Sequence, residues 1–350
     1  MHFASDNGSG VPAEVLDALG RANDGHAAGY GSDPLTLRVR DRLREVFEAP
    51  DAAVYLVATG TAANALALAC LCQPWDAVYC HRTAHVEEDE CGAPEFYTGG
   101  AKLVLVDGAD GRMDPAALDR AIRFTGRAGV HNVQRGMVTL TNVTETGTVH
   151  SVDQVAELAG IARAHGLPVH MDGARFANAL VAAGCTPAEM TWKAGIDVLS
   201  FGGTKNGLMG VEAVILFDPE KAWEFELRRK RGGHLFSKYR YLAAQMDAYL
   251  QGDLWLRLAG QANGMARRLS EGLTGRADAG LLHPTEANMV FARFPRAVHR
   301  RLQAAGARYY LWPFDQSLEG PGDEPVSCRL VCSWSTTAAD VDGFLAAMDG

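Results

Sequence analysis

The sequence has few of the features that mark nucleic-acid-binding, membrane or secreted proteins. Lysine and arginine together number 33 against 42 aspartates and glutamates, a net charge of −9 at pH 7. That balance argues against a surface that neutralises nucleic-acid phosphates. No apolar run reaches membrane-spanning length, and the start, MHFASDNGSG, lacks the basic and apolar parts of a secretory signal. We therefore expect no nucleic acid and no membrane among the partners.

Common signature motifs are also missing. The chain contains no G-x-G-x-x-G, G-x-x-x-x-G-K, H-E-x-x-H or G-x-S-x-G, so dinucleotide, P-loop, zinc-protease and hydrolase sites lack their usual signals. Cys80, His81, His85 and Cys91 lie close together, but their spacing fits no common zinc pattern, and we expect no metal. The seven cysteines are odd in number and scattered, which favours free thiols in a reducing, cytoplasmic compartment.

Short apolar strands alternate with amphipathic helices over most of the chain. Strands are predicted at 52–58, 77–80, 103–106, 137–141, 168–171 and 198–201, and helices at 12–22, from 34 onward, 60–72, 115–124 and 152–164. This alternation predicts an α/β fold with a mainly parallel sheet covered on both faces. A long helical stretch at 240–273 and later short strands and helices predict a smaller α/β domain. We expect an N-terminal arm and large domain at 1–245 and a small C-terminal domain at 246–350.

The first positive motif is Thr59-Gly60-Thr61, which follows the 52–58 strand and opens a helix. Small residues at this turn leave backbone N–H groups free to face an anion, and the helix dipole adds partial positive charge. The motif therefore indicates a phosphate-binding turn. A tight turn with a threonine cap is the alternative.

The second and third motifs each follow a predicted strand. Asp172 lies at the carboxyl end of the 168–171 strand, where open α/β sheets bind ligands. A buried aspartate needs a cationic partner, which could be a protonated pyridine nitrogen or, structurally, Arg175. Lys205 lies in a glycine-rich turn after the 198–201 strand. A partly desolvated lysine has a lowered pKa and can form a Schiff base, whereas the alternative is an ordinary loop lysine.

Together the three motifs supply what pyridoxal 5′-phosphate needs. This cofactor requires a held phosphate, a protonated pyridine nitrogen and an amine that captures its aldehyde. From about residue 5 to about residue 334 the chain resembles the L-threonine aldolases, fold-type I pyridoxal-phosphate enzymes of the β-eliminating lyase group. It is most similar to the low-specificity branch that includes phenylserine-type enzymes. The resemblance is carried by FASDN, YGSDP, TGTAANALAL, TAHVEEDECGAPEF, HMDGARFANA, EMTWKAGIDVLSFGGTKNG and CRLVCSW.

The resemblance implies the reversible cleavage of L-threonine, L-allo-threonine and related β-hydroxy-α-amino acids, such as L-phenylserine, to glycine and an aldehyde. It implies that Lys205 carries the cofactor as a Schiff base and that Asp172 holds the pyridine nitrogen. His85 would stack on the ring near the substrate β-hydroxyl and suits the role of base. Another pyridoxal-phosphate lyase or an aminotransferase is the alternative, because these cofactor residues serve all such reactions.

Further roles follow from the same resemblance. The phosphate would be bound by Gly60 and Thr61, with Arg175 also near the cofactor. The substrate carboxylate would be bound by Ser5, Arg175 and Arg329, since an arginine fork suits a carboxylate. The family forms homo-oligomers, usually dimers paired into tetramers. At the subunit interface we expect Tyr30 to line the site and Lys230 or Arg231, with Lys238 as a further candidate, to reach a neighbouring subunit's phosphate.

One position departs from the family pattern. Some threonine aldolases carry a second histidine where this chain has Glu145, in the segment TNVTETG. The position follows a predicted strand at the ligand-binding edge, so we expect Glu145 to orient His85 or a water molecule. The basic run that contains Lys230 and Arg231 begins with Arg228 and Arg229, for which a solvated helix face is the alternative.

Overall fold

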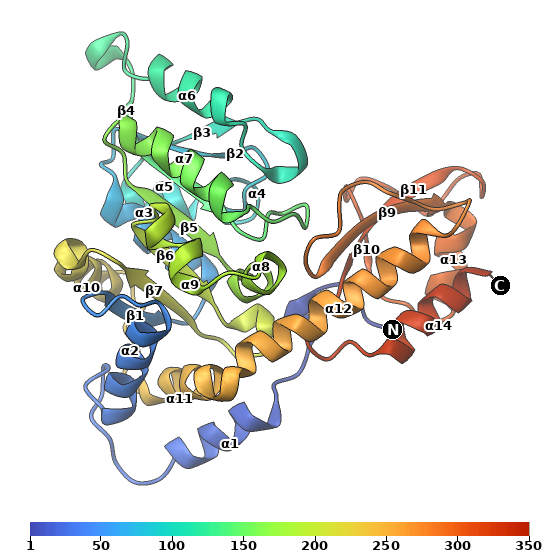
Figure 1. Cartoon of the computed structure of the whole chain (residues 1–350), viewed down its shortest axis with the longest axis horizontal. Coiled ribbons are helices and arrows are strands. Elements are labelled where there is room, and N and C mark those ends of the chain that lie inside the picture. Colours follow the sequence, from blue (N-terminus) through green and yellow to red (C-terminus); the bar gives the residue numbers. More distant parts are fainter. Residues whose placement is uncertain (350) are drawn as a thin grey trace.

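The computed structural model describes residues 1–349. At the centre of the molecule is a seven-stranded sheet with the order β1-β7-β6-β5-β4-β2-β3 (Figure 1). The strands are β1 (Ala53–Val57), β2 (Asp76–His81), β3 (Lys102–Val106), β4 (Gln134–Thr141), β5 (Val169–Gly173), β6 (Val198–Gly202) and β7 (Glu212–Leu216). Only β7 runs antiparallel to its neighbours, β1 and β6. The other neighbouring strands are parallel, which confirms the predicted mainly parallel sheet.

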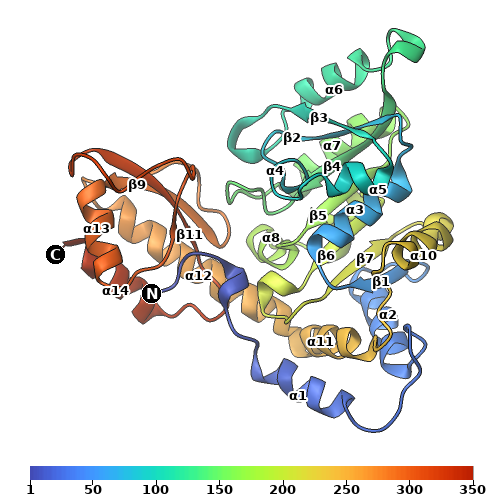
Figure 2. The same ribbon diagram turned by 180° about the vertical axis from the view of Figure 1, so that it is seen from behind.

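Helices cover both faces of this sheet, as Figures 1 and 2 show from opposite sides. The side chains of β1 alternate between two core clusters: Val54 and Leu56 join the larger one, whereas Tyr55 packs with α3 and α10 on the other face. The helices of this part are α1 (Ala13–Ala22), α2 (Pro34–Val46), α3 (Gly60–Leu71), α4 (His85–Glu88), α5 (Ala93–Thr98), α6 (Pro115–Phe124), α7 (Val152–Ala164), α8 (Phe176–Ala183), α9 (Pro187–Met190), α10 (Ala222–Arg231) and α11 (Arg240–Leu250).

A second, smaller sheet lies beyond the long helix α12 (Leu254–Thr274). Its four strands are antiparallel in the order β10-β11-β9-β8. They are β8 (Gly280–Leu281), β9 (Met289–Pro295), β10 (Tyr310–Leu311) and β11 (Pro325–Val331), with α13 (Arg296–Ala304) and α14 (Ala338–Asp349). This smaller α/β unit has a core cluster of its own.

The two cores do not divide at residue 245, where the sequence predicts a boundary. That residue lies inside α11, and the larger core continues into α12 as far as Ala259. The smaller core takes up α12 from Ala266 onward, because this 21-residue helix runs along both units. The smaller core also includes Phe3, since the N-terminal arm crosses to it and His2 pairs with Arg308.

The predicted helical stretch at 240–273 is two helices. Gly252 and Asp253, between α11 and α12, both have left-handed backbone angles, with φ of 55° and 54°. A left-handed residue cannot continue a right-handed helix, so the chain changes direction here. Among the helices of residues 1–349, none combines the length and apolar composition that crossing a bilayer requires. All seven cysteines are free.

Candidate active site

A cavity of about 270 Å³ opens at the carboxyl ends of β1, β5 and β6. The three predicted motifs meet there, although they lie far apart in the sequence. Ligands of open α/β sheets bind at this edge because several strand ends converge on it. The cavity is lined by Asn7, Ala58, Thr59, Gly60, Thr61, Asn64, His85, Asp172, Ala174, Thr204, Lys205 and Glu212.

The turn before α3 presents free backbone donors to this cavity. Thr59 caps the helix, and its hydroxyl accepts a hydrogen bond from the N–H of Ala62 at 3.2 Å. Within residues 1–349, the N–H groups of Gly60 and Thr61 have no acceptor. A Cβ atom at Gly60 would meet nothing within 4 Å. The threonine cap and the phosphate-binding turn are therefore compatible, since the cap uses one donor and leaves two for an anion.

Close backbone packing holds the Asp172 and Lys205 turns together. A Cβ atom on Gly202, the last residue of β6, would lie 2.2 Å from the carbonyl oxygen of Ala174. No side chain fits into that gap, so glycine is required here. The glycine-rich sequence around Lys205 thus brings the turn after β6 against the turn after β5.

Asp172 is buried and held by two donors. Its Oδ1 atom accepts from the N–H of Ala174 at 3.0 Å, and its Oδ2 atom accepts from the Asn64 amide at 2.9 Å. The alternative ion pair with Arg175 does not form, because the Arg175 guanidinium binds Asp6 instead. The carboxylate therefore faces the cavity without a cation from residues 1–349, which suits a protonated pyridine nitrogen.

A hydrogen-bonded chain joins His85 to this aspartate. One Glu90 oxygen lies 2.8 Å from His85 Nδ1 and 2.8 Å from Asn64 Nδ2, and the same amide reaches Asp172. Burial alone would lower the pKa of His85, but the Glu90 hydrogen bond and the Asp172 charge outweigh it, so this pKa is raised. Burial raises the pKa of Glu90. Glu90 and Asn64 fall inside motifs that carried the resemblance, yet no local pattern in the sequence indicates their role.

Arg175 is tied to the N-terminal arm. Its Nε and Nη2 atoms donate to Asp6 at 2.7 and 3.1 Å, and Asp6 also accepts from Asn288 at 3.0 Å. Burial alone would lower the Arg175 pKa, but the charge of Asp6 and its hydrogen bond outweigh that effect and raise it. Of the donor groups of Arg175, Nη1 remains without a partner in residues 1–349. Asp6 was not predicted, since 169 residues separate it from Arg175.

Arg329 lies on β11 beside two aromatic rings. Its guanidinium carbon is 5.0 Å from the Trp312 ring centroid and 5.9 Å from that of Tyr310. Its Nε atom is buried without a hydrogen-bond partner in the described chain, and burial lowers its pKa. A buried guanidinium with an unused donor suits an anionic ligand. Ser5 lines a neighbouring cavity with Tyr310, and its hydroxyl accepts from the N–H of Asn7 at 3.2 Å.

Glu145 follows β4 and is half-buried. Its negative charge contributes to raising the pKa of His85 and of Arg175, and it partly offsets the lowering of the Arg329 pKa. Glu145 thus acts through its charge on three of the predicted site residues, although it does not line the cavity itself.

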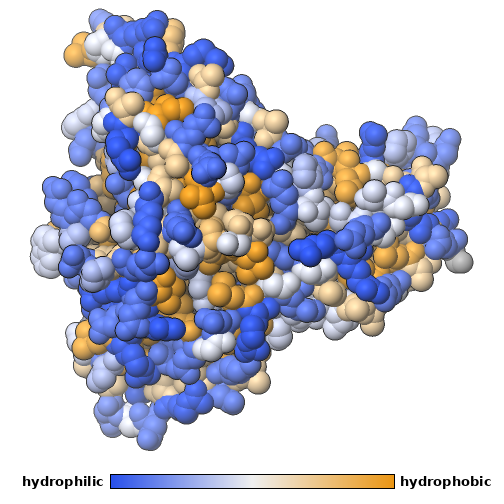
Figure 3. Space-filling model, viewed as in Figure 1, coloured by the Kyte–Doolittle hydropathy of each residue, from blue (hydrophilic) through white to orange (hydrophobic). Residues whose placement is uncertain are grey.

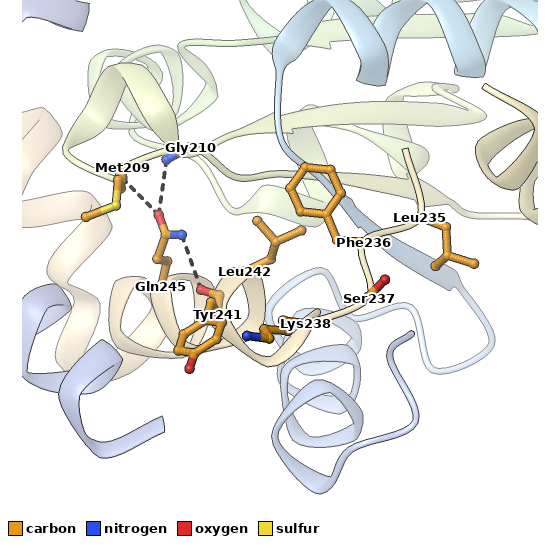
Figure 4. Close-up of a pocket in the computed structure, with 9 residues that line it drawn as sticks. All are labelled: Met209, Gly210, Leu235, Phe236, Ser237, Lys238, Tyr241, Leu242 and Gln245. Atoms are coloured by element: carbon orange, nitrogen blue, oxygen red, sulfur yellow. Dashed lines mark hydrogen bonds between the residues drawn. The ribbon is translucent and has the colours of Figure 1, made fainter. Parts of the chain in front are cut away.

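The residues expected at a subunit interface lie outside the cavity. Tyr30 is half exposed, with the Lys230 ammonium 5.2 Å from its ring centroid, and its N–H donates to Ser237. Lys238 lines a separate surface pocket, drawn in Figure 4, where Gln245 accepts from the N–H groups of Met209 and Gly210. Those two residues belong to the segment that follows Lys205.

The basic run on α10 divides into buried and exposed residues. Arg229 is buried and donates to Tyr239 Oη at 2.7 Å, so a solvated face is wrong for this residue. Arg228 pairs with Glu224 of the same helix at 2.7 Å. Lys230 and Arg231 are exposed and form no ion pair within residues 1–349. These two cations are therefore available to a group from outside the chain.

A family model described as β-eliminating lyase matches residues 2–295. The chain belongs to the β-eliminating lyase family. It is 44% identical to a low specificity L-threonine aldolase of Pseudomonas aeruginosa, over 96% of this chain and 93% of that protein. It is 42% identical to the low specificity L-threonine aldolase of a Pseudomonas strain, over 97% of this chain and 95% of that protein.

The fold also matches solved structures. A threonine aldolase from Leishmania major superposes with a TM-score of 0.91 at 27% identity, covering 99% of this chain and 98% of that one. Serine palmitoyltransferase of Sphingomonas wittichii matches with a TM-score of 0.68 at 16% identity, over 100% of this chain and 86% of that chain, which shows the fold alone. These similarities confirm the predicted fold-type I architecture.

Proposed function

We propose that this family member is a pyridoxal 5′-phosphate-dependent L-threonine aldolase, an aldehyde lyase that cleaves L-threonine to glycine and an aldehyde. The observation that carries the proposal is the meeting of Lys205, Asp172 and His85 at one cavity. The near full-length identity to low specificity L-threonine aldolases supports the same reaction. We extend the proposal to L-allo-threonine and to aryl substrates such as L-phenylserine.

The residues at the cavity fit the cofactor. The free N–H groups of Gly60 and Thr61 would hold its phosphate, Asp172 would keep its ring nitrogen protonated, and Lys205 would bind its aldehyde carbon. When bound, the cofactor supplies an electron sink for the carbanion left at the substrate α-carbon. The protein's own part is to align the substrate and move protons.

His85 is the proposed base for the β-hydroxyl proton. An ionised Glu90 can only accept hydrogen bonds, so it fixes the proton of His85 on Nδ1 and leaves the Nε2 lone pair free. A base with a pKa near neutral suits this step. We propose that Glu145 orients His85 or a water molecule through its charge. A Glu145→Gln variant with unchanged kcat and unchanged diastereomer preference would contradict that role.

The substrate carboxylate would meet cations from both units of the fold. Arg329 offers its unused Nε donor from β11, and Arg175 offers Nη1 from the turn after β5. Ser5 on the N-terminal arm lies in the adjacent cavity. Binding the carboxylate at this place would fix the α-carbon, so that the bond to the β-carbon can be aligned for cleavage.

We propose that the enzyme is a homo-oligomer, a dimer or a dimer of dimers, in which Lys230 or Arg231, with Lys238 as a further candidate, reaches the phosphate of a neighbouring subunit. The support is the exposed position of these cations outside their own cavity. Figure 3 shows hydrophobic patches among the hydrophilic residues of the large unit. Large apolar patches mark interaction sites. A cytoplasmic location stays a prediction.

The test is aldehyde release from L-threonine, L-allo-threonine, L-phenylserine and their D forms, with added pyridoxal 5′-phosphate. We expect glycine and aldehyde in equal amounts from L forms only. The ratio of kcat/KM values among them gives the diastereomer and side-chain preference. A protein that binds the cofactor but releases no aldehyde from any of these compounds would instead be another pyridoxal-phosphate lyase or an aminotransferase.

A further inference from the structure

Glu212 is a buried carboxyl group on the cavity wall that none of the proposed steps uses. It is the first residue of β7, the one antiparallel strand of the large sheet, and is 5% exposed. Its backbone partners are Val57 at the end of β1 and Gly202 at the end of β6. Because β1 leads to the phosphate-binding turn and β6 leads to Lys205, Glu212 lies between the two turns.

The Glu212 side chain binds the turn that carries Lys205. One of its carboxyl oxygens accepts from the N–H of Gly203 at 2.6 Å. Burial raises the pKa of Glu212 to about 7, although hydrogen bonding from this turn and the charge of Lys205 oppose that effect. On α11, burial and the charge of Glu212 raise the pKa of Tyr249. Asp172 and His85 line the same cavity.

We propose that Glu212 takes up a proton when the cofactor phosphate enters the cavity, so that cofactor binding is linked to proton uptake at this carboxyl group. The proposal rests on the proposed cofactor. A phosphate ester carries a charge of about −1.5 to −2 near neutral pH. Placing it beside an ionised carboxylate in a buried site is unfavourable, and the carboxylate is the group that can be neutralised by one proton from solvent.

Protonation preserves the contacts that Glu212 makes with the Lys205 turn. The neutral carboxyl group still accepts from the Gly203 N–H through its carbonyl oxygen, and its new O–H adds a donor to a cavity wall that otherwise carried a negative charge. The ionised form would favour the free Lys205 ammonium before the cofactor binds. Glu212 would thus be ionised while the cavity holds only the free Lys205 amine, and neutral once the cavity holds the cofactor phosphate.

The test uses pyridoxine 5′-phosphate, which has the phosphate but no aldehyde and therefore cannot react with Lys205. Its binding to the cofactor-free protein is measured by titration calorimetry in pairs of buffers with different ionisation enthalpies, between about pH 7 and 8.5. Glu212→Gln keeps the size of the side chain and mimics the protonated form. Exposed Glu157 on α7 provides the matched control, Glu157→Gln.

We expect the native protein and Glu157→Gln to take up more protons per site than Glu212→Gln, with an excess that approaches one as the pH rises above 7. Their affinity should accordingly fall up to about tenfold per pH unit relative to Glu212→Gln, because log K falls by one unit per pH unit for each proton taken up on binding. Equal proton counts in native protein and Glu212→Gln would overturn the proposal. A native protein that takes up no protons on binding would also overturn the proposal. This result does not require the variant to fold.

A separate measurement distinguishes a failure of the proposed function from a failure of the proposed role of Glu212. Pyridoxal 5′-phosphate is added to the native protein, and its covalent attachment is detected by borohydride reduction and mass spectrometry. No attachment would count against the proposed function. Attachment at Lys205 together with equal proton counts would preserve that function and reject the role of Glu212.

Discussion

At the scale of single residues, two buried carboxylates share one amide, and one of the two also binds an imidazole. Asn64 donates to both Glu90 and Asp172, and Glu90 also binds His85. The amide separates two like charges that would otherwise compete for one proton. This arrangement allows each carboxylate a distinct task, since Asp172 would face the cofactor ring and Glu90 binds His85, the proposed base.

Replacing Glu90 should therefore change the pH dependence of the reaction. The Glu90 hydrogen bond and charge help to raise the pKa of His85, so Glu90→Gln should lower that pKa. Because the neutral imidazole is the active form, the acidic limb of the kcat/KM profile should move to lower pH. The kcat should fall by about 10- to 100-fold, less than the 10²- to 10⁴-fold loss that is typical of removing a general base.

The control is Glu87→Gln, a neighbouring exposed carboxylate of the same segment that should leave both the profile and the rate unchanged. Glu90→Asp should recover part of the pH dependence, because it restores the charge. A Glu90→Gln enzyme with reduced activity but an unshifted acidic limb would show that Glu90 supports only the local packing.

Replacing Lys205 should abolish cleavage. In Lys205→Ala the amine that binds the cofactor aldehyde is gone, so aldehyde release from L-threonine should fall to background. Borohydride reduction should attach the cofactor to the native chain and not to the variant. Lys193→Ala, at a surface lysine paired with Glu48 at 2.6 Å, is the control and should stay active. Full activity in Lys205→Ala would overturn the assignment of this lysine.

The sequence could predict the residues with motifs of their own but not the residues that support them. Lys205 and Asp172 stand in recognisable turns after apolar strands. Asn64 is 108 residues from Asp172, and Asp6 is 169 residues from Arg175. Such contacts depend on the order of strands in the sheet and on the path of the N-terminal arm, and neither leaves a local pattern.

At the scale of elements, local signals are strongest where a cap and a periodic pattern agree. The predicted helix at 152–164 matches α7, which has a capping box between Ser151 and Gln154. β7 was not predicted, although it carries Glu212 and lies between β1 and β6 in the sheet. Its five residues directly follow the glycine-rich turn of Lys205, and a short apolar run there could equally well be loop or helix.

The approach of the β5 and β6 turns gives a prediction at this scale. Gly202→Ala would place a Cβ atom 2.2 Å from the Ala174 carbonyl oxygen, so the two turns must separate. We expect a loss of about 1–3 kcal/mol in unfolding free energy, as for other overpacked sites, together with weaker cofactor binding. Denaturant unfolding of the cofactor-free protein and titration with pyridoxal 5′-phosphate measure the two effects.

Gly160, in the middle of α7, is the matched control for this substitution. It is exposed, and a Cβ atom there would meet nothing within 4 Å. Gly160→Ala should raise the unfolding free energy by about 0.5–1 kcal/mol, because alanine is the better helix former. If Gly202→Ala had the same stability and cofactor affinity as the native chain, the close contact at Gly202 would not be needed for folding or for cofactor binding.

At the scale of the whole molecule, the site draws on parts that belong to different cores. In the proposed site, Asp6 comes from the N-terminal arm, Asp172 and Lys205 come from the end of β5 and the turn after β6, and Arg329 comes from β11 of the smaller unit. Asn288, just before β9, also binds Asp6. Asp6 thus links the small unit to Arg175. A movement of either unit would therefore shift Arg175, which is proposed to bind the substrate carboxylate.

The proposed contribution from a second subunit can be tested by mixing two inactive variants. Lys205→Ala removes the lysine of a subunit's own site, whereas Lys230→Ala with Arg231→Ala would remove the cations given to the neighbour. In a hybrid dimer one site carries both defects and the other carries none. Random mixing should therefore restore about a quarter of the native activity, because half of the dimers are hybrids with one intact site each.

The mixing experiment is run at a limiting cofactor concentration, and it depends on the double variant losing activity because it binds the cofactor too weakly. Its affinity for pyridoxal 5′-phosphate should fall at least about tenfold, as expected when a charge-assisted contact to phosphate is lost. Arg228→Ala is the control on the same helix, since Arg228 pairs with Glu224 within its own chain, and it should keep the native affinity. Sites that lie wholly within one chain would give no recovery on mixing, because each subunit would keep its own defect.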